Sequence, residues 1–202
     1  MSEIGTLIFD LGNVVIGHDD EFLTRRIVER SPASTEKVNK AWRQLRNRFQ
    51  RGEMAPREFF EKFSRVLGGF EGNYEGFKQV LSSHFSRKRE MEAFVRKVSD
   101  SGYKIALLSN TNAIHYEFIE DNFPVVELFD PVILSFRVGA RKPEKEIFKA
   151  ALERISAEPE ECVFIDDREE NARAAERAGI RGIHFRGKES LLRELEELGI
   201  EF

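Results

Sequence analysis

The stretch LIFDLGNVVI, residues 7–16, contains an apolar run that stops at one carboxylate, Asp10. The chain then turns through Gly12 and Asn13 and becomes apolar again. An isolated charge at the end of a buried strand costs free energy, so Asp10 needs a compensating partner. The stretch therefore predicts a buried first strand that delivers Asp10 to a site with a charge or a ligand to balance it.

The chain after residue 87 alternates short apolar runs with amphipathic helical patterns. Strands that alternate with helices favour a parallel sheet with helices on both faces. We therefore predict an α/β fold with a Rossmann-like, doubly wound, mostly parallel sheet. The expected strands lie at 103–109, 131–135, 162–166 and 181–185, and the expected helices lie at 91–102, 143–155, 168–179 and 190–199.

Residues 19–86 follow a different pattern, with four helical segments and no strand expected between them. These segments are 21–30, 34–49, 55–68 and 74–85. An all-helical insert directly after the first strand is the simplest organisation. We therefore expect an α/β core made of residues 1–18 and 87–202, and a helical insert made of residues 19–86.

Composition limits the classes of function. Of the 202 residues, 41% are hydrophobic and 34% are charged, which is typical of a globular protein. A formal net charge of −4 gives no reason to expect a nucleic-acid partner, and no apolar run is long enough to span a bilayer. The single cysteine, Cys162, and the absence of a secretory signal before Asp10 suggest a cytoplasmic protein. Nothing in the sequence specifies an oligomeric state.

Polar side chains follow three of the expected strands at the point where each strand ends. In open α/β sheets, ligands bind beyond the carboxyl ends of the strands. One polar ending means little, because turn residues are usually polar, but three at one edge would assemble a metal and anion site. The residues are Asp10, Ser109, Asn110, Asp166 and Asp167, with Lys142 in a loop just before the helix that Pro143 begins.

These residue types suit a phosphate ester and a magnesium ion. Carboxylates of Asp10 and of Asp166 or Asp167 are hard oxygen ligands for Mg²⁺, and the Gly12 carbonyl could supply another oxygen. Backbone N–H groups of residues 11–13 could bind a phosphoryl oxygen.

A covalent mechanism is open to the same site. Ser109 offers a hydroxyl and Lys142 offers a point charge to the phosphate. With the charge neutralised, Asp10 could attack phosphorus and form an aspartyl phosphate.

The order of these motifs resembles the haloacid dehalogenase superfamily, whose members are mostly Mg²⁺-dependent phosphatases. The motifs are D-L-G-N-V at 10–14, S-N-T at 109–111, K-P at 142–143 and I-D-D-x-x-x-N at 165–171. The FDLGNV spelling is similar to a subgroup that includes bacterial sugar-phosphate and glucose-1-phosphate phosphatases. The helical insert is similar to the first-position helical cap (type C1) of that superfamily.

The resemblance implies a role for each matching residue. Asp10 matches the nucleophile, Ser109 the phosphate-binding hydroxyl and Lys142 the charge-neutralising lysine. Asp166 and Asp167 match the metal-binding acids. Two asparagines, Asn110 and Asn171, lie within the motifs without a settled role, and Asn110 is a candidate for substrate binding. The implied function is Mg²⁺-dependent hydrolysis of a small phosphorylated metabolite.

One position departs from the family pattern. The family has an aspartate two residues after the nucleophile, where it acts as general acid and base, but this chain has Gly12. Glycine cannot transfer a proton, and such help is worth roughly 10²–10⁴-fold in rate. His18, Asp19 and Asp20 are the candidates to replace it.

Two other functions remain open at this stage. Carbon–halogen hydrolysis shares the aspartate nucleophile but needs no Mg²⁺, so the paired acids Asp166 and Asp167 count against it. The second alternative is a non-catalytic phospholigand-binding protein of the same fold.

Other residues receive structural interpretations by default. The helical pattern places Trp42, Arg46 and Phe49 on one face, with core packing as their default role, and His115 is expected to be a partly buried structural histidine.

Overall fold

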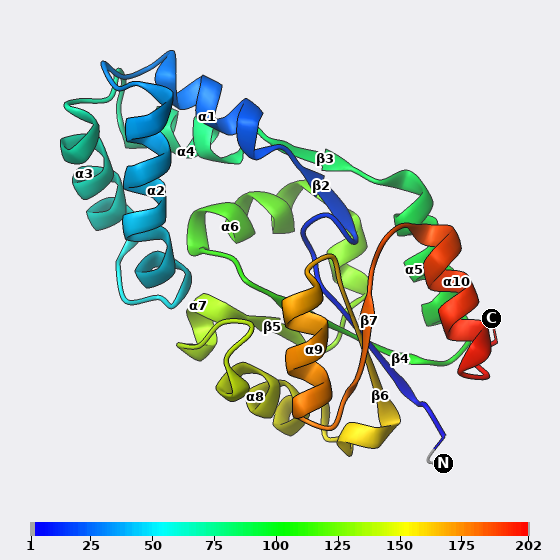
Figure 1. Ribbon diagram of the computed structural model, residues 1–202. Helices are drawn as coiled ribbons and strands as arrows, with labels where there is room; N and C mark the ends of the chain where they lie inside the picture. The colour runs from blue at the N-terminus through cyan, green and yellow to red at the C-terminus, as the bar shows by residue number, and fades with distance from the viewer. Residues whose placement is uncertain (1–2, 202) are drawn as a thin grey trace.

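The structure is a computed structural model that describes residues 3–201. Its centre is a five-stranded sheet with the order β5-β4-β1-β6-β7, in which every neighbouring pair is parallel (Figure 1). This confirms the predicted α/β fold class with a parallel, Rossmann-like sheet. The strands are β1 (Thr6–Phe9), β4 (Lys104–Ser109), β5 (Val132–Leu134), β6 (Cys162–Asp166) and β7 (Arg181–His184).

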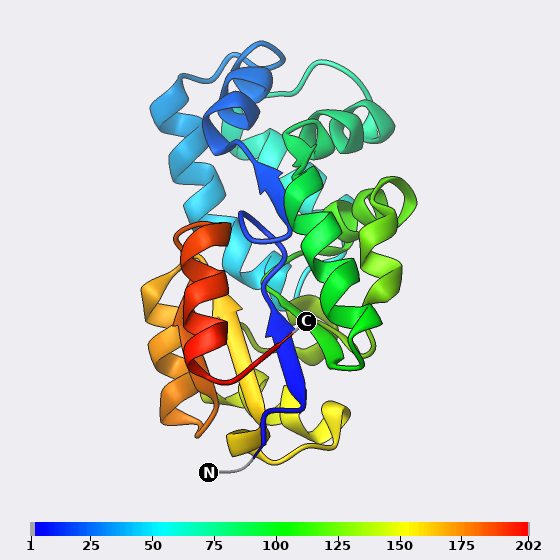
Figure 2. The ribbon, with the colours of Figure 1, turned by 90° about the vertical axis from the view of Figure 1, so that its right-hand side faces the viewer.

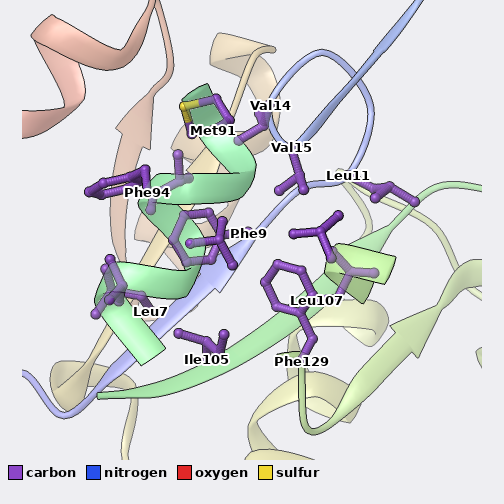
Figure 3. Close-up of a cluster of buried hydrophobic side chains, with 14 of the residues drawn as sticks. Leu7, Phe9, Leu11, Val14, Val15, Met91, Phe94, Ile105, Leu107 and Phe129 are labelled. Atoms are coloured by element: carbon purple, nitrogen blue, oxygen red, sulfur yellow. The ribbon is translucent and has the colours of Figure 1, made fainter. Parts of the chain in front are cut away.

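Helices cover both faces of the sheet, because alternate side chains of each strand point to opposite faces. Leu7 and Phe9 of β1 pack in one apolar cluster with α5, α6 and α10, and Figure 3 shows Phe9 beside Phe94 of α5. Ile8 packs in a second cluster with α8 and α9. These helices are α5 (Arg89–Asp100), α6 (Ala113–Asn122), α8 (Lys145–Ile155), α9 (Glu169–Arg177) and α10 (Lys188–Glu197).

Four helices after β1 form a lobe with its own core, and the lobe lies beyond one end of the sheet (Figures 1 and 2). Phe49, Phe59, Phe63 and Phe77 are fully buried in this core, which explains part of the phenylalanine content. An apolar face that packs in this way supplies most of the stability of such helices. The helices are α1 (Asp20–Val28), α2 (Thr35–Gln50), α3 (Pro56–Leu67) and α4 (Tyr74–Ser82).

A short antiparallel ribbon joins this lobe to the sheet. It pairs β2 (Ile16–His18) with β3 (Phe85–Arg87), and His18 lies opposite Phe85. Within the described residues 20–82 no strand lies between the four helices, as expected, but the helix expected over 74–85 ends at Ser82 and its last expected residue, Phe85, begins β3. Three-residue strands are too short to show alternation in the sequence, and their pairing joins segments far apart in the chain.

Both crossings between the sheet and the lobe pass through the β2–β3 ribbon. We propose that the boundaries between the core, residues 1–18 and 87–202, and the cap, residues 19–86, lie at this ribbon. Shorter elements complete the described chain: α7 (Ser135–Val138) and two 3₁₀ turns, η1 (Pro124–Leu128) and η2 (Pro159–Glu161). Within residues 3–201, none of the helices combines the length and the apolar character needed to cross a membrane.

Candidate active site

The carboxyl ends of three adjacent strands bring the predicted residues together. Strands β4, β1 and β6 are parallel neighbours, so Ser109, Asp10 and Asp166 reach the same edge of the sheet. The Asp10 N–H donates to the Ile165 carbonyl at 2.8 Å, which fixes the backbone of Asp10 beside β6. Ser109 and Asp10 both line a cavity of about 460 Å³ between the sheet edge and the helical lobe.

Lys142 lies almost completely buried between two carboxylates. Only 1% of its side chain is exposed, and its Nζ lies 2.8 Å from Asp10 Oδ1 and 2.7 Å from Asp166 Oδ2. Its ammonium also donates to the Leu108 carbonyl at 2.8 Å. A cation at this position balances the buried charge of Asp10. This is the compensating partner that the sequence around Asp10 predicts.

Asn110 holds the backbone of Lys142 in place. Its Nδ2 donates to the Lys142 carbonyl at 2.9 Å, and its Oδ1 accepts from the Lys142 N–H at 2.8 Å. Asn110 also lines the cavity, so a contact with substrate stays a prediction for this residue. The hydrogen bonds that the structure shows indicate that Asn110 positions Lys142.

The pKa values of Asp10 and Lys142 are both raised, but for different reasons. Burial raises the pKa of Asp10 to about 7, against the lowering effect of Lys142 and with a further increase from Asp166. Burial would lower the pKa of the Lys142 ammonium, but Asp10 and Asp166 outweigh burial and raise it. Lys142 therefore stays charged, and Asp10 is a carboxylate whose ionisation depends on nearby cations.

The acidic residues fit a small hard cation. One carboxylate oxygen of each of Asp10, Asp166 and Asp167 lies within 4.8 Å of the others. Asp166 already accepts hydrogen bonds from Lys142 Nζ, from Asn171 Nδ2 at 2.9 Å and from the Arg168 N–H at 2.9 Å.

Asp167, unlike Asp166, lines the cavity. Burial raises the pKa of Asp167 most, and the negative charge of Asp166 raises it further. Such an increase is expected where carboxylates lie close together without a cation. Asp167 is therefore the better candidate to bind metal, and Asp166 orients Lys142 and Asn171.

The turn after β1 is tight, and a histidine occupies the space beside its glycine. Asn13 has a left-handed backbone with φ of 58°, which asparagine tolerates better than most residues. A Cβ atom on Gly12 would lie 3.0 Å from His18 Nδ1. A side chain at position 12 would therefore need the His18 imidazole to shift by a few tenths of an ångström.

The structure distinguishes between His18, Asp19 and Asp20, the three candidates for the missing proton donor. Asp19 caps α1, where its Oδ1 accepts the Phe22 N–H at 2.8 Å, and this contact gives it a structural task. His18 and Asp20 line the cavity, and 3.9 Å separates His18 Nε2 from Asp20 Oδ1. The imidazole of His18 stands where a side chain at position 12 would project.

The helical lobe contributes one face of α2 to the cavity. Trp42, Arg46 and Gln50 follow one another at intervals of four residues and all line it. Phe49 has the core-packing role expected of it, because it lies in the core of the lobe and stacks on Phe59 with ring centroids 4.2 Å apart. The four-residue spacing was visible in the sequence and would have identified Gln50.

Two further histidines line the cavity, and sequence analysis missed one of them, His84. Burial, and then the neighbouring His18, lowers the pKa of His84 to about 4. Burial, and then His84, lowers the pKa of His115 well below its ordinary value. His115 is 7% exposed and stacks against Trp42, so it is more buried than expected. Both histidines are neutral at neutral pH.

Comparisons with known proteins agree with this geometry. A sequence model of the haloacid dehalogenase-like hydrolases matches residues 4–179. The chain is 26% identical to D-ribitol-5-phosphate phosphatase of Bacteroides thetaiotaomicron, over 87% of this chain and 89% of that protein. It is 28% identical to flavin mononucleotide hydrolase 1 of Arabidopsis thaliana over 75% of this chain, and the match spans 61% of that relative's length.

A solved structure provides a third comparison. A HAD-family enzyme of Bacteroides thetaiotaomicron, crystallised with magnesium and inorganic phosphate, superposes with a TM-score of 0.81 at 27% identity. The superposition covers 94% of this chain and 98% of that enzyme.

Proposed function

This chain belongs to the haloacid dehalogenase-like hydrolases and is one of the phosphatases of that family, and on that premise we propose that it hydrolyses phosphomonoesters of small metabolites through a phosphorylated Asp10. The observation that carries this proposal is the group of Asp10, Lys142 and Asp167 that lines one cavity. The FDLGNV motif favours a sugar phosphate, and the similarity to a D-ribitol-5-phosphate phosphatase favours a polyol phosphate.

The proposed reaction has two displacements at phosphorus. An Asp10 oxygen attacks phosphorus, the P–O bond to the leaving group breaks, and its electron pair stays on the leaving oxygen, which takes up a proton. Water then attacks the aspartyl phosphate and releases inorganic phosphate and free Asp10. The Leu11 N–H and the Lys142 ammonium both bond to Asp10 Oδ1, which orients the carboxylate for attack.

The surrounding residues neutralise charge and bind the phosphoryl oxygens. Ser109, which is 4% exposed at the end of β4 and lines the cavity, would donate its hydroxyl to one of them. Asp10, Asp167 and the Gly12 carbonyl would hold Mg²⁺, which supplies charge neutralisation at the phosphoryl group when bound. Asp166 keeps Lys142 in position.

The metal requirement separates this function from its alternatives. We expect phosphate release from an aryl phosphate to need Mg²⁺, and Asp167→Ala to weaken Mg²⁺ binding and lower activity, each by about 10–100-fold. Calorimetry with Mg²⁺ and a phosphate-release assay with and without a chelator measure the two effects.

Asp100→Ala is the matched control, because Asp100 is exposed at the end of α5. Full phosphate release in the presence of the chelator would contradict the metal role, whereas halide release from a haloacid without phosphate release would identify dehalogenase-type chemistry. Mg²⁺ and phosphate binding without phosphate release would identify a non-catalytic ligand-binding protein.

We also propose that His18 supplies the proton that Gly12 cannot. The imidazole lines the cavity at the position that a side chain on residue 12 would occupy. His18→Asn should lower turnover of an alkyl phosphate by about 10²-fold, and that of an aryl phosphate much less, because a phenolate leaves without protonation.

A swap of residues 12 and 18 provides the control. Gly12→Asp alone should damage the site, because its Cβ would lie 3.0 Å from His18 Nδ1. Adding His18→Ala removes that contact and should recover alkyl-phosphate turnover. Equal losses on both substrates in His18→Asn would show that His18 has only a structural task.

A further inference from the structure

Two arginines from different parts of the fold line the cavity. Arg46 comes from α2 of the helical lobe, and Arg141 comes from the loop before Lys142 in the core. Both side chains are partly buried. They therefore face the same enclosed space above the edge of the sheet.

The guanidinium Nε atoms of these two arginines have no partner. Arg46 Nε and Arg141 Nε are both buried, and neither makes a hydrogen bond to any residue that the structure describes. A buried donor left unpaired destabilises the folded protein. By contrast, Arg51 pairs with Glu144 and Arg168 pairs with Glu170. The missing partners of Arg46 and Arg141 point to a ligand that enters the cavity.

The positive charges of Arg46 and Arg141 favour binding of an anion in the cavity. Burial lowers the pKa of Arg141, and the positive charges of Arg46 and Arg51 lower it further, while Glu144 offsets only part of this effect. Two like charges held together in a partly buried space repel each other, and an anionic group between them would remove that cost. Planar guanidinium groups bind phosphate and carboxylate oxygens in pairs.

The scissile phosphate is not the best candidate for this anion. Asp10 attacks it from the sheet edge, and an in-line displacement places the leaving oxygen on the side opposite Asp10. The leaving group therefore extends away from the sheet and toward the lobe, where Arg46 stands. In the proposed function, Lys142 and Ser109, which line the cavity at the sheet edge, bind the phosphoryl group.

Gln50 adds a requirement for a hydrogen-bond donor. Its Nε2 donates to the Asn110 carbonyl at 3.4 Å, whereas its Oε1 is buried with no partner among the described residues. A hydroxyl group on the leaving group would satisfy this acceptor. Gln50 lies one turn of α2 after Arg46 and lines the same cavity.

We propose that the substrate is a phosphorylated polyol that carries a second anionic group, a phosphate or a carboxylate, on its leaving group, and that Arg46 and Arg141 bind this second anion. The inference rests on the proposed phosphatase function and narrows its substrate class. Trp42 forms an apolar wall beside the polyol chain, and Gln50 accepts one of its hydroxyl groups.

Three substrates with one carbon skeleton test the proposal. They are a five-carbon polyol 5-phosphate, the 1,5-bisphosphate of the same polyol, and the corresponding aldonate 5-phosphate, which carries a carboxylate. For the Mg²⁺-loaded protein we expect kcat/KM for at least one doubly anionic substrate to exceed that for the monophosphate by about 10-fold or more, mainly through KM. Comparison of the bisphosphate with the aldonate phosphate identifies the second anion.

Arg46→Met supplies the decisive variant, because Arg46 is in the lobe and outside the reacting group. It should lower kcat/KM for the preferred substrate by about 10–100-fold and that for the monophosphate by less than about 3-fold. Arg46→Lys should recover part of the loss. Arg48→Met is the matched control, because Arg48 is exposed on the same helix and pairs with Glu53.

The outcomes distinguish this inference from the proposed function. Equal kcat/KM for all three substrates, or an equal loss on all three in Arg46→Met, overturns the second-anion site and leaves the phosphatase function intact. No phosphate release from any substrate overturns the function. The inference is then judged by calorimetry on the Mg²⁺-loaded Asp10→Asn protein. Tighter binding of a doubly anionic substrate than of the monophosphate, lost on replacement of Arg46, supports the inference. Equal binding of all three substrates refutes it.

Discussion

Turnover should fall by about 10⁴-fold or more when Asp10 is replaced by asparagine. An amide cannot attack phosphorus usefully, so no aspartyl phosphate forms. The same variant should no longer be trapped by beryllofluoride, which mimics a phosphoryl group on the Asp10 carboxylate. Steady-state phosphate release and a trapping experiment with Mg²⁺ measure the two losses.

The Asp10→Asn protein should remain folded. Burial raises the pKa of Asp10 to about 7, so above pH 7 the folded protein without metal holds an unfavourable carboxylate. Its removal should leave the free energy of unfolding at pH 8 equal to or above that of the parent. Asp100→Asn, on the exposed end of α5, is the control. Activity of the Asp10→Asn protein within about 100-fold of the parent would contradict the covalent mechanism.

Replacement of Lys142 by methionine should affect both stability and activity. Methionine keeps most of the volume but leaves Asp10 and Asp166 buried next to each other without their cation. Removal of one partner of a buried ion pair costs about 3–5 kcal/mol, so the metal-free variant should unfold at much lower denaturant concentration. Activity should fall as well, because no point charge would balance the phosphoryl group.

Magnesium should recover part of the stability lost in Lys142→Met, because a bound cation would again neutralise the carboxylates. The shift in the denaturation midpoint on addition of Mg²⁺ should therefore be larger for this variant than for the parent. Lys149→Met is a suitable control, because Lys149 is exposed on α8. A loss of stability no larger in Lys142→Met than in the control would show that Lys142 does not compensate Asp10 and Asp166.

The sequence was sufficient for the α/β fold and for the identity of the residues at the sheet edge. Asp10, Ser109 and Asp166 are each attached to the end of a short apolar strand, so the local pattern predicts both the strand and the polar residue that follows it. Parallel strands then bring those ends together without further information. The catalytic roles of these residues remain predictions, to be tested by the substitutions above.

Only the tertiary structure decided how these residues interact. The position of Lys142 between Asp10 and Asp166 depends on burial and on distances between separate elements. The β2–β3 ribbon depends on pairing between segments on either side of the helical lobe, which no local pattern shows.

The shape and charge of the cavity likewise depend on contacts between distant parts of the chain. The His18 side chain fills the space beside Gly12, and Arg46 of the lobe reaches the same cavity as Arg141 of the core. A helical pattern shows which residues share a face, but it does not show what that face meets. The sequence by itself therefore determined the elements and the reactive groups at their ends. Folding of the lobe over the sheet edge determined what the site can bind, because binding depends on side chains brought together from distant parts of the chain.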